Sequence, residues 1–286
     1  MFKVENLHFT YPKNHEETLK GLSFQIEEGE IFGFLGPSGA GKSTTQKILI
    51  KLLDRFDGVI TYKGKDLASY HDDFYEDIGV SFEMPIHFSK MTAMENVHFF
   101  QKLYQRHADI EHLMTSVGLW QDRDKMVSEY SKGMKIRLNF VRAMLNDPKM
   151  LFLDEPTNGL DPTNAMILKD MIRVFKQQGG TVFITSHIMS DIDQLCDRVA
   201  FIVDGVIKEI DSPRNLKIKY GKKTIKVDYH EQGLLKTEEF PMQKIGSNEA
   251  FIKLIQTKPI ETIHSGETTL EEIFIKVTGV GLNHEQ

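Results

Sequence analysis

The sequence contains almost no cysteine. Cys196 is the single one among 286 residues, so an intrachain disulfide is impossible and a reducing, cytosolic setting is favoured. Long apolar runs are also missing, because no stretch approaches the roughly 20 apolar residues that span a bilayer. The opening segment, MFKVENLHFTYPKNHEE, has no apolar core of the kind that a secretion signal requires. We therefore expect any role at a membrane to depend on a partner protein.

Positive charge is in deficit as well. Lys and Arg number 35 against 41 Asp and Glu, which gives a formal net charge of −6. This balance argues against a general nucleic-acid binder. The remaining composition, with 40% hydrophobic and 27% charged residues, is typical of a globular protein. The length allows one large domain, or a domain with an appendage.

Strand and helix patterns alternate along most of the chain. Short strands are expected in residues 1–35, a helix at 42–53, and mostly helical structure at 91–146. Strand patterns return in the segments KMLFLDEP, TVFITSH and RVAFIVDGVIKEI. Helical stretches separate these strands, as in a parallel sheet that is covered by helices. The expected fold class is therefore α/β.

The pattern changes after Lys219. The segment KKTIKVDYH alternates like a half-exposed strand, and NEAFIKLIQ is typical of a short helix. Thr269 precedes Glu272 at the spacing of a helix capping box. We therefore expect a main domain of residues 1–219 and a small α+β domain of residues 220–286.

The stretch FGFLGPSGAGKSTTQKIL interrupts an apolar run with small residues, hydroxyls and a lysine. It matches the pattern G-x-x-x-x-G-K-[ST], in which backbone N–H groups and a helix N-terminus surround a phosphate group. Lys42 would reach the β- and γ-phosphates, and Ser43 would place its hydroxyl on Mg²⁺. The alternative is a plain glycine-rich turn, but a buried strand before the loop and a helix after it favour a nucleotide triphosphate site. The residues expected to bind it are Gly36, Pro37, Ser38, Gly39, Ala40, Gly41, Lys42, Ser43 and Thr44.

The segment MLFLDEPTNGLD carries two carboxylates at the end of an expected buried strand. Asp154 can there reach the Mg²⁺ shell, and Glu155 can be the general base that polarises an attacking water. His187 ends the strand TVFITSH and could contact the γ-phosphate and hold the water in register with Glu155. The alternatives are an acidic turn and a structural histidine. We expect Lys42, Glu155 and His187 to be catalytic.

Five motifs occur in the order of one known family: GPSGAGKST, YSKGMKIRL, LFLDEP, NGLD and TSH. On these motifs the chain resembles the nucleotide-binding subunit of an ATP-binding-cassette (ABC) transporter over roughly residues 1–215. The resemblance implies a P-loop NTPase (RecA-like) core with an antiparallel β subdomain and a helical subdomain at about residues 84–146. It also implies that the chain binds ATP and Mg²⁺. The ending TTLEEIFIKVTG is similar to the closing helix of cassettes that serve ABC-2 type exporters.

The resemblance implies a second phosphate-binding surface. In the family, two cassettes pack head to tail, so that Ser131 and Gly133 of the signature would close on the partner's ATP and Asp161 would contact the opposite subunit. The signature departs from the usual LSGGQ, because Lys132 replaces the first glycine. Tyr11 stands where the family has an aromatic that stacks on adenine. The alternatives are a simple helix cap at Ser131 and a core position for Tyr11.

A further departure is Glu83, which stands where the family usually has a glutamine. A glutamate there could ligate Mg²⁺ as a hard anionic oxygen, and it would add negative charge near the γ-phosphate. Alternatively, the alignment is shifted and Glu83 is a surface residue. Residues 84–104 are rich in apolar and aromatic side chains. In the family this region helps to form the groove for a cytoplasmic helix of the permease; the alternative is that these side chains pack the helical subdomain's core.

The leading hypothesis is an ATPase subunit, peripheral on the cytoplasmic face of the cell membrane, that drives export of a drug, lipid or polysaccharide-like substrate. Its expected partners are an integral membrane permease and a second cassette, identical or paralogous, and no nucleic acid. One alternative is a soluble cassette acting on DNA or ribosomes, against which the single ATP site and the acidic charge argue. Another is a regulatory cassette without turnover, which Glu83 and Lys132 favour and Glu155 and His187 oppose.

Overall fold

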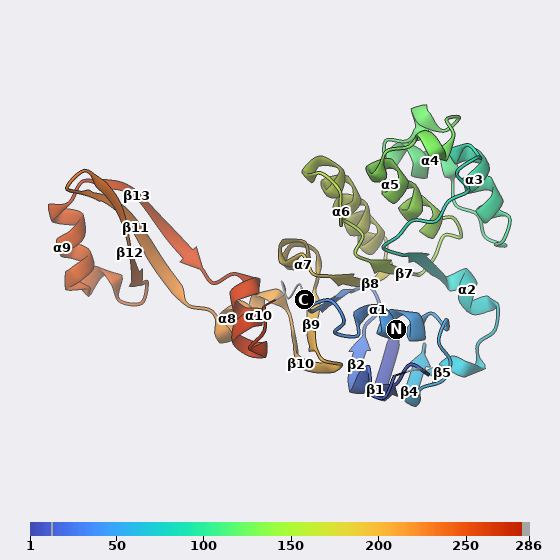
Figure 1. Ribbon diagram of the computed structural model, residues 1–286, viewed down its shortest axis with the longest axis horizontal. Coiled ribbons are helices and arrows are strands. Elements are labelled where there is room, and N and C mark those ends of the chain that lie inside the picture. Colours follow the sequence, from blue (N-terminus) through green and yellow to red (C-terminus); the bar gives the residue numbers. More distant parts are fainter. Residues whose placement is uncertain (13, 282–286) are drawn as a thin grey trace. The chain divides into compact units, whose positions relative to one another are not determined.

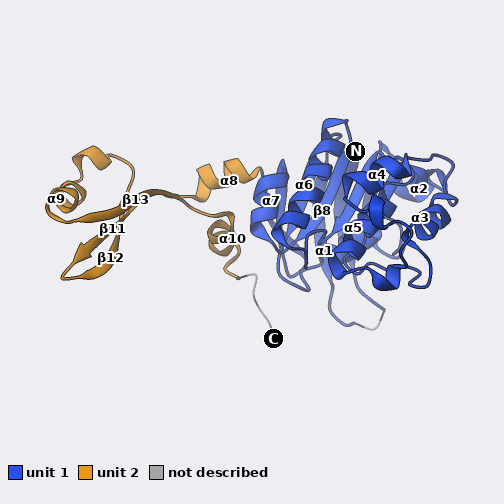
Figure 2. Cartoon of the chain, turned by 90° about the horizontal axis from the view of Figure 1, so that it is seen from above, with its two compact units in different colours: residues 1–211, 281–286 blue, residues 212–280 orange. Residues whose placement is uncertain are grey.

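The structure is a computed structural model that describes residues 1–12 and 14–281. The chain divides into two compact units, which Figure 2 colours blue (residues 1–211 and 281–286) and orange (residues 212–280). Helix α8 (Pro213–Tyr220), which spans the boundary expected after Lys219, belongs to the second unit because it packs against helix α10 (Leu270–Thr278). The end of the expected second domain, residues 282–286, lies outside the described residues. No helix in the described part of the chain is long and apolar enough to cross a membrane.

The first unit is built on a six-stranded sheet with the order β10-β9-β3-β8-β7-β6. Neighbouring strands from β9 to β6 run parallel, and β10 pairs antiparallel with β9 at one edge. Strands β3, β7 and β8 are buried along their whole length, which explains their mostly apolar sequences. The predicted α/β fold with a parallel sheet is confirmed. Its strands are β3 (Ile31–Leu35), β6 (Ile78–Ser81), β7 (Met150–Asp154), β8 (Thr181–Ser186), β9 (Arg198–Val203) and β10 (Val206–Asp211).

A second sheet of the first unit is antiparallel, with the order β2-β1-β4-β5. Buried and exposed side chains alternate along β2 and much of β1, since one face of this sheet packs on the core. The Phe2 ring lies edge-on to Phe152 of β7 at 5.8 Å between centroids, and the Phe24 ring stacks on Phe32 of β3 at 5.7 Å. These aromatic contacts hold the two sheets together. The strands are β1 (Phe2–Phe9), β2 (Leu19–Ile26), β4 (Asp57–Tyr62) and β5 (Lys65–Asp66).

Helices α3, α4 and α5 gather in one group between strands β6 and β7 of the chain (Figure 1). Helix α3 begins with a capping box in which the side chains of Thr92 and Glu95 each accept from the other's backbone N–H. Helix α5 packs on β6 and α3, so its first turn is held at a fixed place beside the sheet. The helices of this unit are α1 (Lys42–Leu49), α2 (Asp73–Asp77), α3 (Ala93–Gln101), α4 (Ile110–Ser116), α5 (Lys132–Ala143), α6 (Pro162–Gln177) and α7 (Met189–Leu195).

The second unit contains a three-stranded antiparallel sheet with the order β12-β11-β13, and helix α9 (Glu249–Thr257). Its small core consists of Val227, Tyr229, Phe240 and Leu254, from β11, β12 and α9. Helix α10 begins with the capping box of Thr269 and Glu272, as the sequence predicted. The strands are β11 (Lys223–Glu231), β12 (Leu234–Pro241) and β13 (Ile260–Glu267).

Candidate functional site

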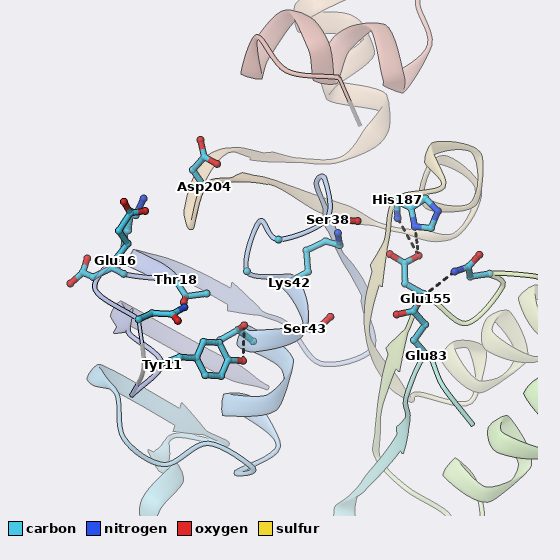
Figure 3. Close-up of a pocket in the computed structure, with 17 residues that line it drawn as sticks. Tyr11, Glu16, Thr18, Ser38, Lys42, Ser43, Glu83, Glu155, His187 and Asp204 are labelled. Atoms are coloured by element: carbon cyan, nitrogen blue, oxygen red, sulfur yellow. Dashed lines mark hydrogen bonds and ion pairs between the residues drawn. The ribbon is translucent and has the colours of Figure 1, made fainter. Parts of the chain in front are cut away.

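A hollow of about 990 Å³ lies at the carboxyl ends of the parallel strands. Glu83, Glu155, His187 and Asp204 each follow one of these strands. The loop after β3 and the first turn of α1 add Ser38, Gly39, Gly41, Lys42, Ser43 and Thr44. Ligands of open α/β sheets bind at this edge. Figure 3 shows Lys42 between two groups of side chains, with Glu155 and His187 on one side and Tyr11 and Glu16 on the other. Residues from distant segments therefore meet in one place.

Glycines allow the loop between β3 and α1 to curl. Gly41, the residue before α1, has φ 104°, a conformation that side chains rarely adopt, and a Cβ there would also lie 2.6 Å from Leu19 Cδ2. A Cβ on Gly36 would collide with the backbone carbonyl of Ile202. The N-cap residue of α1 is Gly41, which has no side chain, so it leaves the first backbone N–H groups of the helix available to an anion.

Lys42 is buried within this loop. Its Nζ donates to the Gly36 carbonyl at 2.7 Å and to the Pro37 carbonyl at 3.1 Å. Burial lowers the pKa of Lys42, while the carboxylates of Glu155 and Asp154 oppose that change. A buried cation with partial charge compensation is suited to a polyanion such as a triphosphate.

The two residues expected to ligate Mg²⁺ on this side, Ser43 and Asp154, are brought together. Ser43 Oγ donates to Asp154 Oδ1 at 3.2 Å, and Thr185 Oγ1 of the neighbouring strand donates to the same oxygen. Within the described residues, no cluster of three or more His, Cys, Asp or Glu could hold a metal by itself. A hydroxyl and one carboxylate fit Mg²⁺, which usually keeps several waters and takes its other oxygens from substrate phosphates.

Glu155 and His187 also meet. The His187 backbone N–H donates to Glu155 Oε2 at 3.2 Å, and its ring Nδ1 lies 2.9 Å from the same oxygen. The Glu155 side chain is only 8% exposed, and its backbone has φ 49°, which is unusual for a residue other than glycine. Its N–H is fixed by the Thr185 carbonyl at 3.0 Å. A carboxylate held in this way can accept a proton from a water beside the phosphate loop.

Glu83 reaches the same hollow. Asn158 Nδ2 donates to Glu83 Oε1 at 3.1 Å, and both residues line the hollow together with Lys42 and Glu155. The role of Glu83 as a ligand of Mg²⁺ stays a prediction. Asn158 was not predicted, although it belongs to the segment EPTNGLD, because its contact with Glu83 depends on how two distant segments fold.

Tyr11 stands at the opposite end of the hollow. Its hydroxyl lies 3.2 Å from Thr44 Oγ1, and its ring packs edge-on against Phe9 at 4.8 Å between centroids. The ring is half-buried and lines the hollow, so it can present a face to a nucleobase. Further lining residues that the sequence did not indicate are polar: Asn14, Glu16, Glu17, Thr18, Lys20 and Asp204.

The residues that are expected to meet a second cassette lie elsewhere. In the part of the chain that the structure describes, Ser131, Gly133 and Asp161 do not line the hollow. Ser131 caps α5, with its Oγ accepting from Met134 N–H at 3.2 Å. Asp161 caps α6 by accepting from two backbone N–H groups at 3.0 Å, and its hydrogen bonds to Asn164 hold its pKa below the ordinary value. Both therefore have structural roles within their own chain.

Two sequence families match the chain. The family described as ABC transporter matches residues 19–158. A second family, described as the fluoroquinolone efflux ABC transporter C-terminal domain, matches residues 223–267. The first match spans the phosphate loop and the Glu155 segment, and the second lies within the three-stranded sheet unit.

Known proteins extend these matches over the whole chain. A fluoroquinolones export ATP-binding protein of Mycobacterium tuberculosis is 48% identical over 281 residues, which cover 98% of this chain and 93% of that protein. A bacitracin transport ATP-binding protein of Bacillus licheniformis is 32% identical over 289 residues, with 93% and 94% covered. Among solved structures, a dimeric bacterial ABC transporter cassette is 25% identical with a TM-score of 0.68, covering 74% of this chain and 98% of the cassette.

Proposed function

Since this chain belongs to the ATP-binding subunits of the ABC transporter family, we propose that it hydrolyses ATP in a pair of cassettes and so drives export through a separate membrane permease. The relatives are named for export and transport, which favours this function over a soluble cassette acting on DNA or ribosomes. The similarity predicted from the motifs is thus confirmed at the level of the family. Hydrolysis, the partners and the place at the cytoplasmic face of the membrane are our proposals.

The main support for ATP hydrolysis is the contact between Glu155 and His187 beside the phosphate loop. A buried carboxylate 2.9 Å from the histidine ring is positioned to take a proton from an attacking water. The histidine would hold both the carboxylate and the γ-phosphate in register. A regulatory cassette without turnover would not need this pair.

The other residues would act by position and charge. Ser43 and Asp154 would hold Mg²⁺, which when bound neutralises charge on the β- and γ-phosphates. Lys42 would bind the same phosphates from inside the loop, and the N–H groups at the start of α1 would bind their oxygens. Tyr11 would stack on adenine at the far end. Such chemistry depends on orientation and electrostatic stabilisation rather than on a covalent intermediate.

A second cassette would complete the site. Ser131 and Gly133 lie outside the hollow of their own chain, so they can meet a triphosphate only when another chain presents one. One similar cassette was solved as a dimer. In this arrangement Asp161 would lie at the contact with the opposite subunit.

The permease would bind beside Glu83. Met84 and Ile86 are 78% and 81% exposed, and Leu103 of the helical group is 66% exposed. Phe82, Phe88 and Phe99 are exposed as well. Apolar side chains exposed together mark an interaction surface, and an amphipathic helix of a permease would suit it. Phe100 and Tyr104, by contrast, are partly buried, as expected for the core of the helical subdomain.

The proposed cargo is a drug. Both relatives are named for antibiotics, and residues 223–267 match a family named for fluoroquinolone efflux. Of the three cargo classes considered, these names favour a drug over a lipid or a polysaccharide. The permease is expected to select the compound.

Glu155→Gln tests the function directly. The amide keeps the size of the side chain but cannot accept a proton, so hydrolysis should fall by at least about a hundredfold. ATP should then stay bound, and gel filtration with ATP and Mg²⁺ should show a dimer. A variant that hydrolyses ATP normally, or that stays monomeric at every ATP concentration, would contradict the proposal.

A further inference from the structure

The two residues that depart from the family motifs, Glu83 and Lys132, flank the same loop, residues 158–161. On one side, Asn158 Nδ2 donates to Glu83 Oε1 at 3.1 Å. On the other side, the Lys132 side chain lies over Gly159, so close that a Cβ added to Gly159 would be 2.7 Å from Lys132 Cε. Both charged residues are exposed. A glutamate and a lysine therefore occupy opposite borders of one surface loop.

The hollow itself carries excess negative charge. Its lining includes five carboxylates, from Glu16, Glu17, Glu83, Glu155 and Asp204, against two lysines, Lys20 and Lys42, a balance of −3 with histidine neutral. A nucleoside triphosphate is itself a polyanion. Mg²⁺ offsets part of this charge, but the extra carboxylate at Glu83 weakens the attraction for phosphate. A further cation at the phosphate end would restore it.

Lys132 is placed to be that cation. It is the first residue of α5, as Lys42 is the first residue of α1. It stands between Ser131 and Gly133, the two residues proposed to close on the ATP of a second cassette. We propose that Lys132 of one cassette balances the charge of Glu83 in the nucleotide site of the other. This inference rests on the two-cassette arrangement proposed above.

The pairing follows from the symmetry of such an assembly. In an isologous dimer both chains contribute the same surface. Each nucleotide site, which contains one Glu83, would therefore receive one Lys132 from the other chain. Replacing a neutral glutamine and a neutral glycine by Glu83 and Lys132 leaves the summed charge of the site unchanged. Removing one of the two charges unbalances the site, whereas removing both does not. Their effects on dimer formation must therefore be coupled.

A double-mutant cycle measures that coupling. The full chain carrying Glu155→Gln is the parent, and the quantity measured is the Mg-ATP concentration that gives half-maximal dimer by analytical ultracentrifugation. Lys132→Met keeps an unbranched stem over Gly159 but removes the charge, and it should raise this concentration about tenfold. In a Glu83→Gln background, the same substitution should raise it by less than about threefold. Lys132→Arg, which retains the charge, should dimerise like the parent.

The controls separate this inference from a general effect of charge or folding. Lys253→Met removes one charge from the exposed face of α9 in the second unit and should leave the midpoint unchanged. Thermal unfolding of each variant should match the parent. Equal effects of Lys132→Met in the parent and in the Glu83→Gln background, or no effect in either, would overturn the pairing. If the parent itself stays monomeric with Mg-ATP, the proposed function fails instead.

Discussion

Helices α1 and α5 both begin with a lysine, but their first turns have different surroundings. Lys42 is buried and donates to two carbonyls of its own loop. Lys132 is exposed and lies over Gly159. The N-cap residue of α1 is Gly41, which has no side chain, whereas the Ser131 hydroxyl caps α5.

This difference indicates that the two helix starts have unequal roles in binding. The start of α1 faces a hollow that is also lined by Glu155 and His187, and Ser43 in its first turn donates to Asp154, so one chain supplies most of the site. At the start of α5, by contrast, Ser131 and Lys132 are exposed, and neither lines the hollow in the described part of the chain. We infer that α1 binds the phosphates and that α5 completes the site only from a second cassette.

Among substitutions at the two helix starts, Lys42→Met should have the largest effect on ATP binding. It removes the buried cation from the phosphate loop, so ATP affinity should fall by about a hundredfold. Two opposing effects act on the fold, so its stability should change by less than about 2 kcal/mol: the Gly36 and Pro37 carbonyls lose a donor, but the cost of burying the charge, which lowers the pKa of Lys42, disappears. That cost is present at neutral pH and is relieved as pH rises through the lowered pKa. Calorimetric titration with ATP and thermal unfolding measure the two effects.

A matched control is Lys47→Met, which removes a charge from the last turn of the same helix. Its ATP affinity should stay within about twofold of the unmodified chain. An unchanged affinity in Lys42→Met would contradict the role assigned to the loop.

Gly41→Ala and Gly133→Ala test how the backbone differs between the starts of α1 and α5. At Gly41, φ 104° and the contact with Leu19 should cost alanine about 1–3 kcal/mol of the free energy of unfolding. At Gly133 a Cβ would meet Leu160 at an ordinary 3.4 Å, and alanine favours a helix, so stability should not fall. ATP-driven dimerisation should nevertheless weaken, because a methyl group would cover the Gly133 amide. Urea unfolding and gel filtration distinguish the two variants.

The sequence predicted those parts of the site that local pattern determines. Lys42 and Ser43 follow a buried strand and open a helix, and Asp154 and His187 lie at or just after the ends of buried strands. Each of these relations can be read from neighbouring residues. The parallel sheet could be predicted for the same reason, since apolar strands alternate with helical stretches.

Other features depend on how distant segments pair. Thr185 bonds to Asp154 because β7 and β8 are adjacent in register, and no local pattern reports that pairing. Asp204 reaches the hollow from the turn after β9. Helix α8 joins the second unit through α10, which follows it by some 50 residues in sequence. The role of Ser131 at a partner's phosphate stays a prediction, because one chain shows only its helix cap.

Substitutions at Ser131 test whether this residue is more than a helix cap. Ser131→Ala removes the hydroxyl that accepts from Met134 N–H, which should cost about 1 kcal/mol of stability. Ser131→Asp keeps a capping oxygen and complements the helix dipole, so stability should change by less than about 0.5 kcal/mol.

Both variants should weaken ATP-driven dimerisation, although they differ in stability. Aspartate would place a negative charge against the partner's triphosphate, so Ser131→Asp in the Glu155→Gln chain should fail to dimerise with Mg-ATP while it unfolds like the parent. Gel filtration and urea unfolding of the same sample measure both properties. If Ser131 only caps α5, Ser131→Asp will form the dimer at the parent's ATP concentration. In that case the start of α5 would be an ordinary helix start, and its likeness to α1 would have no functional meaning.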